Sequence, residues 1–111
     1  MMNVLTAIYT YGAETLTVKL NGEIDHHSVR TVREEIDRQI CFRRADKVVL
    51  DLSSVSFMDS SGLGLILGRY TRTKENGGHL VIKNPCKSAE RVLKLAGTDK
   101  IIPVIYDTDS P

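Results

Sequence analysis

The run from Val48 to Leu52, in which Asp51 is the one polar residue, most constrains the fold of this chain. It is short, rich in β-branched residues and almost continuously apolar, which predicts a strand buried on both sides near the centre of a sheet. A second run of this kind covers residues 80–82, after a segment with helical periodicity. Buried strands that alternate with helices are typical of an α/β domain.

Three segments have the periodicity of amphipathic helices: about residues 28–40, 60–76 and 88–96. Gly77-Gly78 and Gly97 mark the ends of the second and the third. The residues expected on the buried faces are Val29, Val32, Ile36 and Ile40 in the first helix, Leu63, Ile66, Leu67 and Tyr70 in the second, and Ala89, Val92, Leu93 and Ala96 in the third.

Three further segments are predicted to be strands. Residues 3–10 and 15–20 flank Gly12, which indicates a hairpin, and residues 101–106 form a last strand. Pro103 lacks a backbone donor, so this last strand is expected at an edge of the sheet. The sequence thus predicts one α/β domain over residues 1–111, a mixed sheet of about five strands with three or more helices, and a flexible tail at 107–111.

Composition and charge argue against several classes of function. Fifteen Lys and Arg against fourteen Asp and Glu give a net charge of +1, which provides no strong field for nucleic acid or anionic lipid. No apolar stretch has the length of a membrane span and no secretory signal is evident, so we expect a cytoplasmic protein. Cys41, Cys86 and the three His show no metal-site spacing, and we expect reduced thiols, no metal and no cofactor.

The segment from Ser53 to Tyr70 carries the most informative chemistry, because a buried strand leads through a short loop into a helix that starts at Asp59-Ser60-Ser61-Gly62. Ser60 or Ser61 is a candidate helix cap. Either serine is also a candidate phosphorylation site, since free amides at a helix N-terminus accommodate a phosphate. A phosphate adds a charge of about −1.5 to −2, here beside Asp59. We expect it to exclude a partner locally and to leave the fold unchanged.

A small enzyme with a serine nucleophile is the alternative to a binding protein. The G-x-S-x-G nucleophile motif is absent, because Met58 and Asp59 stand where its first glycine is needed before Ser60 and Ser61. Covalent labelling of Ser60 by a fluorophosphonate probe would favour the enzyme. Nucleotide binding is disfavoured, since Leu67 occupies the third glycine position of a dinucleotide fingerprint.

Two glycines and one acidic turn need an explanation of their own. Gly64 and Gly68 each cost about 1 kcal/mol in a helix interior, and we expect close packing on the sheet to account for them. Asp25 lies in the loop 22–27 and is an expected N-cap of the first helix. This loop is expected to share an edge of the sheet with the Asp59 loop, so that two acidic turns form one surface.

Two strings resemble the STAS family, named for sulphate transporters and anti-sigma factor antagonists. They are G-E-I-D-H-H at residues 22–27 and F-M-D-S-S-G-L-G-L-I-L-G-R-Y at residues 57–70. The longer string is most similar to the sporulation branch of the family, and the order of elements fits over residues 3–106. A transporter module is disfavoured, because the chain shows no spanning segment.

The resemblance implies that the unmodified protein binds an anti-sigma factor, itself a serine kinase, and so frees a sigma factor. The kinase then phosphorylates and releases the antagonist, and a serine phosphatase restores it. Ser60 is the implied acceptor with Ser61 as second candidate, and Asp25, Asp59 and Gly62 are further implied partner-binding residues. The chain itself has no phosphate-binding glycine loop followed by Lys and no kinase signature, so we expect another protein to supply the phosphate.

Overall fold

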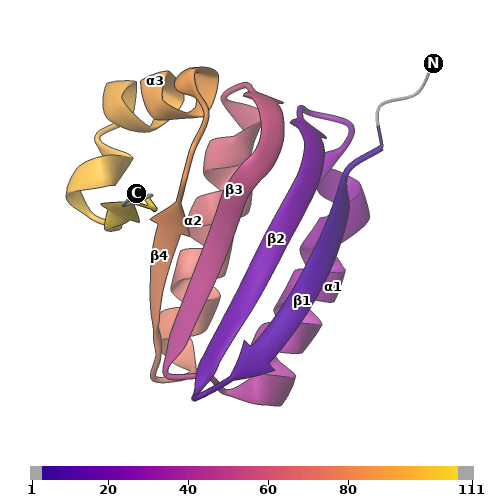
Figure 1. Ribbon diagram of the computed structural model, residues 1–111, viewed down its shortest axis with the longest axis vertical. Helices are drawn as coiled ribbons and strands as arrows, with labels where there is room; N and C mark the ends of the chain where they lie inside the picture. The colour runs from indigo at the N-terminus through magenta and orange to yellow at the C-terminus, as the bar shows by residue number, and fades with distance from the viewer. Residues whose placement is uncertain (1–3, 108–111) are drawn as a thin grey trace.

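The computed structural model describes residues 4–107, which form a five-stranded sheet with three α-helices (Figure 1). A short 3-10 helix, Thr98–Lys100, precedes the last strand. The predicted α/β class is confirmed. The strands are β1 (Thr6–Gly12), β2 (Thr15–Ile24), β3 (Lys47–Met58), β4 (His79–Lys83) and β5 (Val104–Ile105), and the helices are α1 (Val29–Arg43), α2 (Ser61–Glu75) and α3 (Lys87–Leu95).

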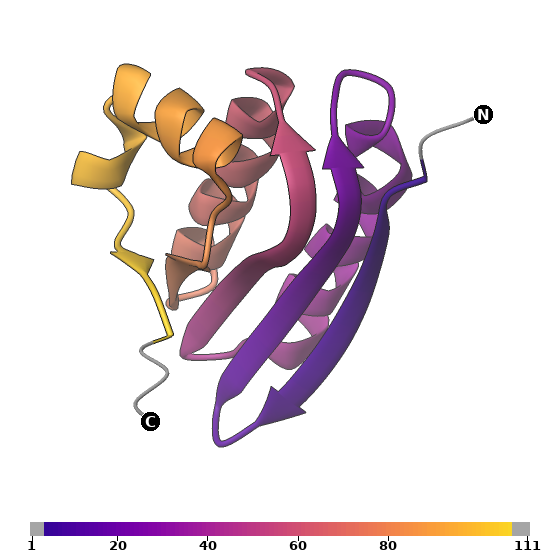
Figure 2. The same cartoon turned by 45° about the horizontal axis from the view of Figure 1, so that its top comes forward.

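The strands lie in the order β1-β2-β3-β4-β5, with β1 antiparallel to β2 and every later pair parallel. Parallel neighbours need a crossover connection, which a helix supplies in each case. Figures 1 and 2 show α1 and α2 side by side on one face of the sheet and α3 beyond the end of β4. As a result, β3 is central, and the carboxyl ends of β2 and β3 meet at the same edge of the sheet.

The main core lies between the sheet and helices α1 and α2. Leu16, Val18 and Leu20 alternate along β2 and are fully buried. The predicted burial of β3 on both faces is also confirmed, because Val49 is only 7% exposed. No helix within residues 4–107 covers that second face in the two views, and Val49 is flanked in register by Thr17 of β2 and Val81 of β4.

The buried face of α2 agrees with the predicted one in part, because Ile66 is buried and Leu63 and Tyr70 pack against the core. Leu67 is 38% exposed, although it was expected in the core. Apolar residues occupy two overlapping faces of this helix. The face that is buried also contains two polar residues, Arg69 and Thr73, which have partners inside the fold. Its members are Gly62, Leu65, Ile66, Arg69 and Thr73. In α3, Ala89 and Leu93 are buried as predicted, whereas Ala96 is exposed.

The ends of the sheet depart from the predicted boundaries. Gly12 ends β1, and the hairpin turn is made by Ala13 and Glu14, both with positive φ. The last strand shortens to β5, because the amides of Ile101 and Ile102 bond back to the carbonyl of Thr98, and it lies at the sheet edge as Pro103 predicted.

The chain is held at Asp107, immediately after β5. Its amide donates a hydrogen bond to Oδ1 of Asn84, and its carboxylate lies 3.2 Å from Nζ of Lys83. Residues 108–111 of the predicted tail lie outside the described residues. None of the helices within 4–107 combines the length and apolarity that a membrane span requires.

Candidate functional site

The loops that follow β2 and β3 lie side by side at one edge of the sheet (Figure 2). Ile24 and Met58 are the last register pair of the two strands, and the amide of Asp59 donates a 3.1 Å hydrogen bond to the carbonyl of Ile24. Asp25 and Asp59 therefore occupy equivalent positions after neighbouring parallel strands. The prediction that both acidic turns share one surface is confirmed.

Each of these carboxylates accepts hydrogen bonds from amides at the start of the next helix. Oδ1 of Asp59 accepts from the amide of Ser61 at 2.8 Å. Oδ1 of Asp25 accepts from the amides of His27 at 3.0 Å and Ser28 at 2.8 Å. Asp25 thus satisfies free amides as a cap does, although the N-cap position itself belongs to Ser28.

The two N-cap serines differ in what their hydroxyls contact. Ser28 is buried, and its hydroxyl donates to the carbonyl of Glu23 at 2.7 Å and accepts from the amide of Asp25 at 2.9 Å. Ser60 is exposed and makes no side-chain cap hydrogen bond. Across the described residues, the hydroxyls of Ser60 and Ser61 have no hydrogen-bond partner. The helix cap expected from one of these serines is supplied by Asp59 instead.

This contrast predicts that Ser28→Ala destabilises the protein by about 1–3 kcal/mol, because a carbonyl and an amide, each in a partly buried hydrogen bond, lose their partner. Ser60→Ala makes the same chemical change at the equivalent helix start. It should leave the free energy of unfolding within about 0.5 kcal/mol of the native value. Urea unfolding of both variants measures the difference, and equal losses would show that the Ser60 hydroxyl has a structural partner after all.

Ser60 and Ser61 line a shallow cavity of about 590 Å³ between the starts of α1 and α2. The opposite wall is formed by His26, just before α1, and by residues of the first turns of α1. Sequence reasoning missed this cationic wall, for which the available signal was two arginines at i, i+3 spacing. The full lining is His26, Val29, Arg30, Arg33, Ser60, Ser61 and Gly64.

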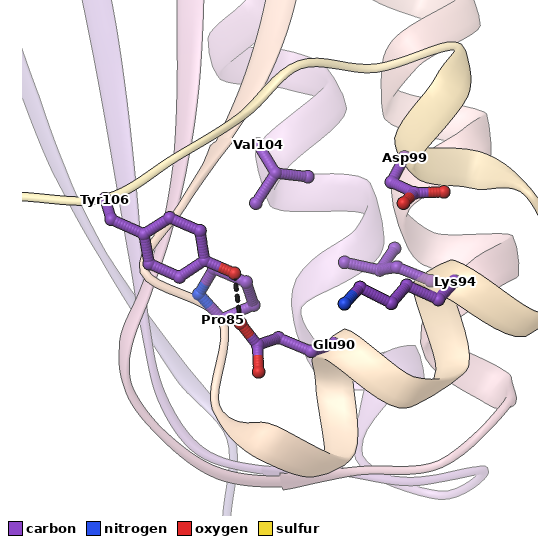
Figure 3. Close-up of a pocket in the computed structure, with 7 residues that line it drawn as sticks. Pro85, Glu90, Lys94, Asp99, Val104 and Tyr106 are labelled. Carbon is purple, nitrogen blue, oxygen red and sulfur yellow. Dashed lines mark hydrogen bonds between the residues drawn. The ribbon is translucent and has the colours of Figure 1, made fainter.

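A second cavity, of about 460 Å³, lies between α3 and β5 and contains none of the predicted site residues (Figure 3). Within it the hydroxyl of Tyr106 donates a hydrogen bond to the carboxylate of Glu90, and this bond, with some burial, raises the pKa of Tyr106 to about 12. No group of three metal-binding side chains occurs in the part of the chain that the structure describes. Of the predicted site residues, Ser60 and Ser61 line the first cavity and none lines the second.

The glycines of α2 have different reasons for lacking a side chain. A Cβ on Gly62 would lie 2.4 Å from Sδ of Met58, so this buried position lets α2 pack against the end of β3. Nothing lies within 4 Å of a Cβ built on Gly64 or Gly68. The expectation that close packing on the sheet explains these two is therefore wrong. They leave open space on the surface of α2, one and two turns after Ser60.

An ion pair joins α1 to α2 beneath this surface. Nε of Arg69 lies 2.9 Å from Oδ1 of Asp37, and Nη2 of Arg72 lies 3.8 Å from Oδ2 of Asp37. Arg69 is buried, which lowers its pKa, and the nearby Asp37 carboxylate opposes that shift. The pair thus links the two helices whose first turns line the Ser60 cavity.

Fold and site together describe a small α/β domain in which one helix starts at a serine whose hydroxyl has no partner within residues 4–107. The model of the STAS domain family matches residues 7–110, and the chain belongs to that family. An anti-sigma F factor antagonist of Paenibacillus polymyxa is 43% identical over 85% of this chain and 80% of its own. Another, from Lysinibacillus sphaericus, is 36% identical over 76% of this chain and 72% of its own.

Solved structures agree with this assignment. The unphosphorylated form of the anti-sigma factor antagonist SpoIIAA superposes with a TM-score of 0.79 at 28% identity, covering 94% of this chain and 90% of that one. The phosphorylated form of the Bacillus protein SpoIIAA gives a TM-score of 0.73 at 28% identity, over 94% and 93% of the two chains. The fold that the resemblance implied is confirmed.

Proposed function

We propose that this chain is an anti-sigma factor antagonist, that it binds an anti-sigma factor with serine kinase activity, and that phosphorylation of Ser60 ends the binding. The observation that carries the proposal is the Ser60 hydroxyl, which is exposed, starts α2 and has no partner among the described residues. Relatives that bear the name anti-sigma F factor antagonist support it, as do the two forms of SpoIIAA that share the fold.

The partner-binding surface consists of the two acidic turns and the exposed side of α2. Asp25, Asp59, Ser60 and Ser61 form its centre. Gly64 and Gly68 extend it, because their open surroundings leave room for close approach of a partner. Gly62 is buried and does not contact the partner itself. It supports the surface indirectly, because its missing side chain lets α2 pack against Met58.

Phosphorylation acts on this surface by changing its charge. The neutral hydroxyl of Ser60 gives way to a group of charge about −1.5 to −2, one residue from the Asp59 carboxylate. A partner that fits the neutral form must then desolvate a phosphate or lose contact with the start of α2. The binding that freed a sigma factor is lost, and a serine phosphatase restores it.

The role is regulatory, and the whole chain 1–111 acts as one STAS domain in the cytoplasm. A serine nucleophile is activated by a base within about 2.6–3.2 Å, and the Ser60 hydroxyl has no such partner within residues 4–107. His26 lines the same cavity without bonding to Ser60. A fluorophosphonate probe separates the two functions, since a binding protein stays unlabelled at Ser60.

Mass spectrometry after incubation with ATP and the anti-sigma kinase tests the acceptor directly. We expect one phosphate on the peptide that contains residues 57–69, located at Ser60 by fragmentation. Ser61→Ala should still be phosphorylated, whereas Ser60→Ala should not. A phosphate that persists on Ser60→Ala would assign the acceptor to another residue and overturn this part of the proposal.

A further inference from the structure

The cavity beside Ser60 has one cationic wall. His26 precedes α1, and Arg30 and Arg33 lie three residues apart on it, so that their side chains share one helix face. Both arginines are exposed and face the wall formed by Ser60 and Ser61. The hydroxyl proposed to receive a phosphate therefore lies across the cavity from two permanent positive charges.

Neither arginine has an anionic partner within residues 4–107. Glu34 and Asp37 lie one helical turn after Arg30 and Arg33 and are the candidates by spacing. Glu34 forms no ion pair within the described residues, and Asp37 is already paired with Arg69 and approached by Arg72. The carboxylates of Asp25 and Asp59 accept amide hydrogen bonds at their own helix starts. The guanidinium groups of the wall thus remain available to an incoming anion.

The first turn of α2 has few amides left to offer that anion. The amide of Ser61 bonds to the Asp59 carboxylate, and the amides of Gly62 and Leu63 bond to the carbonyls of Asp59 and Ser60 at 3.0 and 3.1 Å. The sequence-based expectation that free amides at this helix start accommodate a phosphate is therefore wrong for these three positions. The positively charged side chains of the cavity lining, Arg30 and Arg33, therefore offer the strongest partners for a phosphate on Ser60.

We propose that Arg30, Arg33 and His26 form a phosphate cradle, which holds the phosphate after its transfer to Ser60. The inference rests on the proposed function, because it needs a phosphate at that position. Guanidinium groups bind phosphate oxygens by paired, charge-assisted hydrogen bonds, and His26 adds a ring N–H donor. The cradle favours the dianionic phosphate at neutral pH and ties the start of α2 to the start of α1.

The test uses the full chain with phosphoserine encoded genetically at position 60, so that no kinase is needed. ³¹P NMR then measures the second pKa of the phosphate, which is about 6 without neighbouring charges. We expect it to be lower by at least about half a unit, because nearby positive charges favour the dianion. The double variant Arg30→Gln/Arg33→Gln should abolish that shift. The Nε–Hε signals of Arg30 and Arg33 should also move on phosphorylation.

Two controls separate the cradle from general charge effects. Arg38→Gln/Arg91→Gln removes the same charge from exposed positions outside the cavity lining and should leave the phosphate pKa unchanged. Phosphoserine encoded at Ser53, which is exposed on β3 and close to Asp51, should titrate without the downward shift.

One result would overturn the cradle: equal phosphate pKa values at positions 60 and 53, with no response to the Arg30/Arg33 double variant. The other titratable groups at this edge, Asp25, His27 and Asp59, are the same in every variant at position 60, so their effects cancel in the comparison. Failure of the kinase to modify Ser60 would instead contradict the proposed function, and it would leave the encoded phosphoserine measurement intact.

Discussion

Ser60→Asp should weaken binding to the anti-sigma kinase by at least about tenfold, a loss of roughly 1.4 kcal/mol. The new carboxylate replaces a neutral hydroxyl on the proposed binding surface, and a partner that fits the neutral form must desolvate this charge without a group of its own to pair with it. Ser60→Ala should bind about as tightly as the native chain, because it removes a hydroxyl with no partner in residues 4–107 and adds no charge. Isothermal titration calorimetry with the purified kinase measures both.

Ser53→Asp is the matched control for the added charge. Ser53 is exposed on β3 and lies outside the Ser60 cavity, so this variant should keep the native affinity. If Ser60→Asp bound as tightly as Ser53→Asp, charge at the start of α2 would not be what releases the partner.

Asp37→Ala should be among the most damaging single substitutions for stability, with a loss of about 3 kcal/mol. It leaves the guanidinium of Arg69, whose side chain is only 7% exposed, without its carboxylate. Replacing both members, as Asp37→Leu/Arg69→Met, removes the buried charge as well and should recover most of the loss. Urea unfolding of the single and double variants gives the two values.

Arg72→Ala provides the comparison within the same cluster. The side chain of Arg72 is 46% exposed and lies 3.8 Å from Asp37, so its removal should cost less than about 0.5 kcal/mol. If Asp37→Ala lowered the free energy of unfolding no more than Arg72→Ala does, water would be solvating the Arg69 guanidinium in that variant. The ion pair would then not be what stabilises the packing of α1 on α2.

The order of elements followed from periodicity, because each strand and helix buries one face with a period of its own. The lengths of β2 and β3 could not be predicted from periodicity. Asn21 and Gly22 in β2 and the serines near the middle of β3 are poor strand formers, and pairing between the two strands extends both as far as Ile24 and Met58. Such pairing depends on a neighbour distant in sequence, so a local pattern cannot reveal it.

The site was predictable where it depends on topology. Two parallel strands end at the same edge, which brings Asp25 and Asp59 together whatever the details of packing. What depends on the packing of α1 against α2 was not predictable. That packing decides which stripe of α2 is buried, pairs Arg69 with Asp37, and turns Arg30 and Arg33 toward Ser60. From sequence alone, an arginine such as Arg69 is expected at the surface, because its buried partner is not yet known.

The difference between the two helix starts, one with a hydrogen-bonded serine and one without, has a consequence for cells that carry variants of this protein. Hydrogen bonds of Ser28, Asp25 and Asp59 stabilise the two turns. The side chain at position 60 therefore does not contribute to the stability of the fold. Losses of about 1–2 kcal/mol are enough to change protein abundance several-fold through degradation. Mutations at Ser28 or Asp37 should therefore deplete the antagonist, whereas mutations at Ser60 should leave a full supply of protein that no longer responds to its signal.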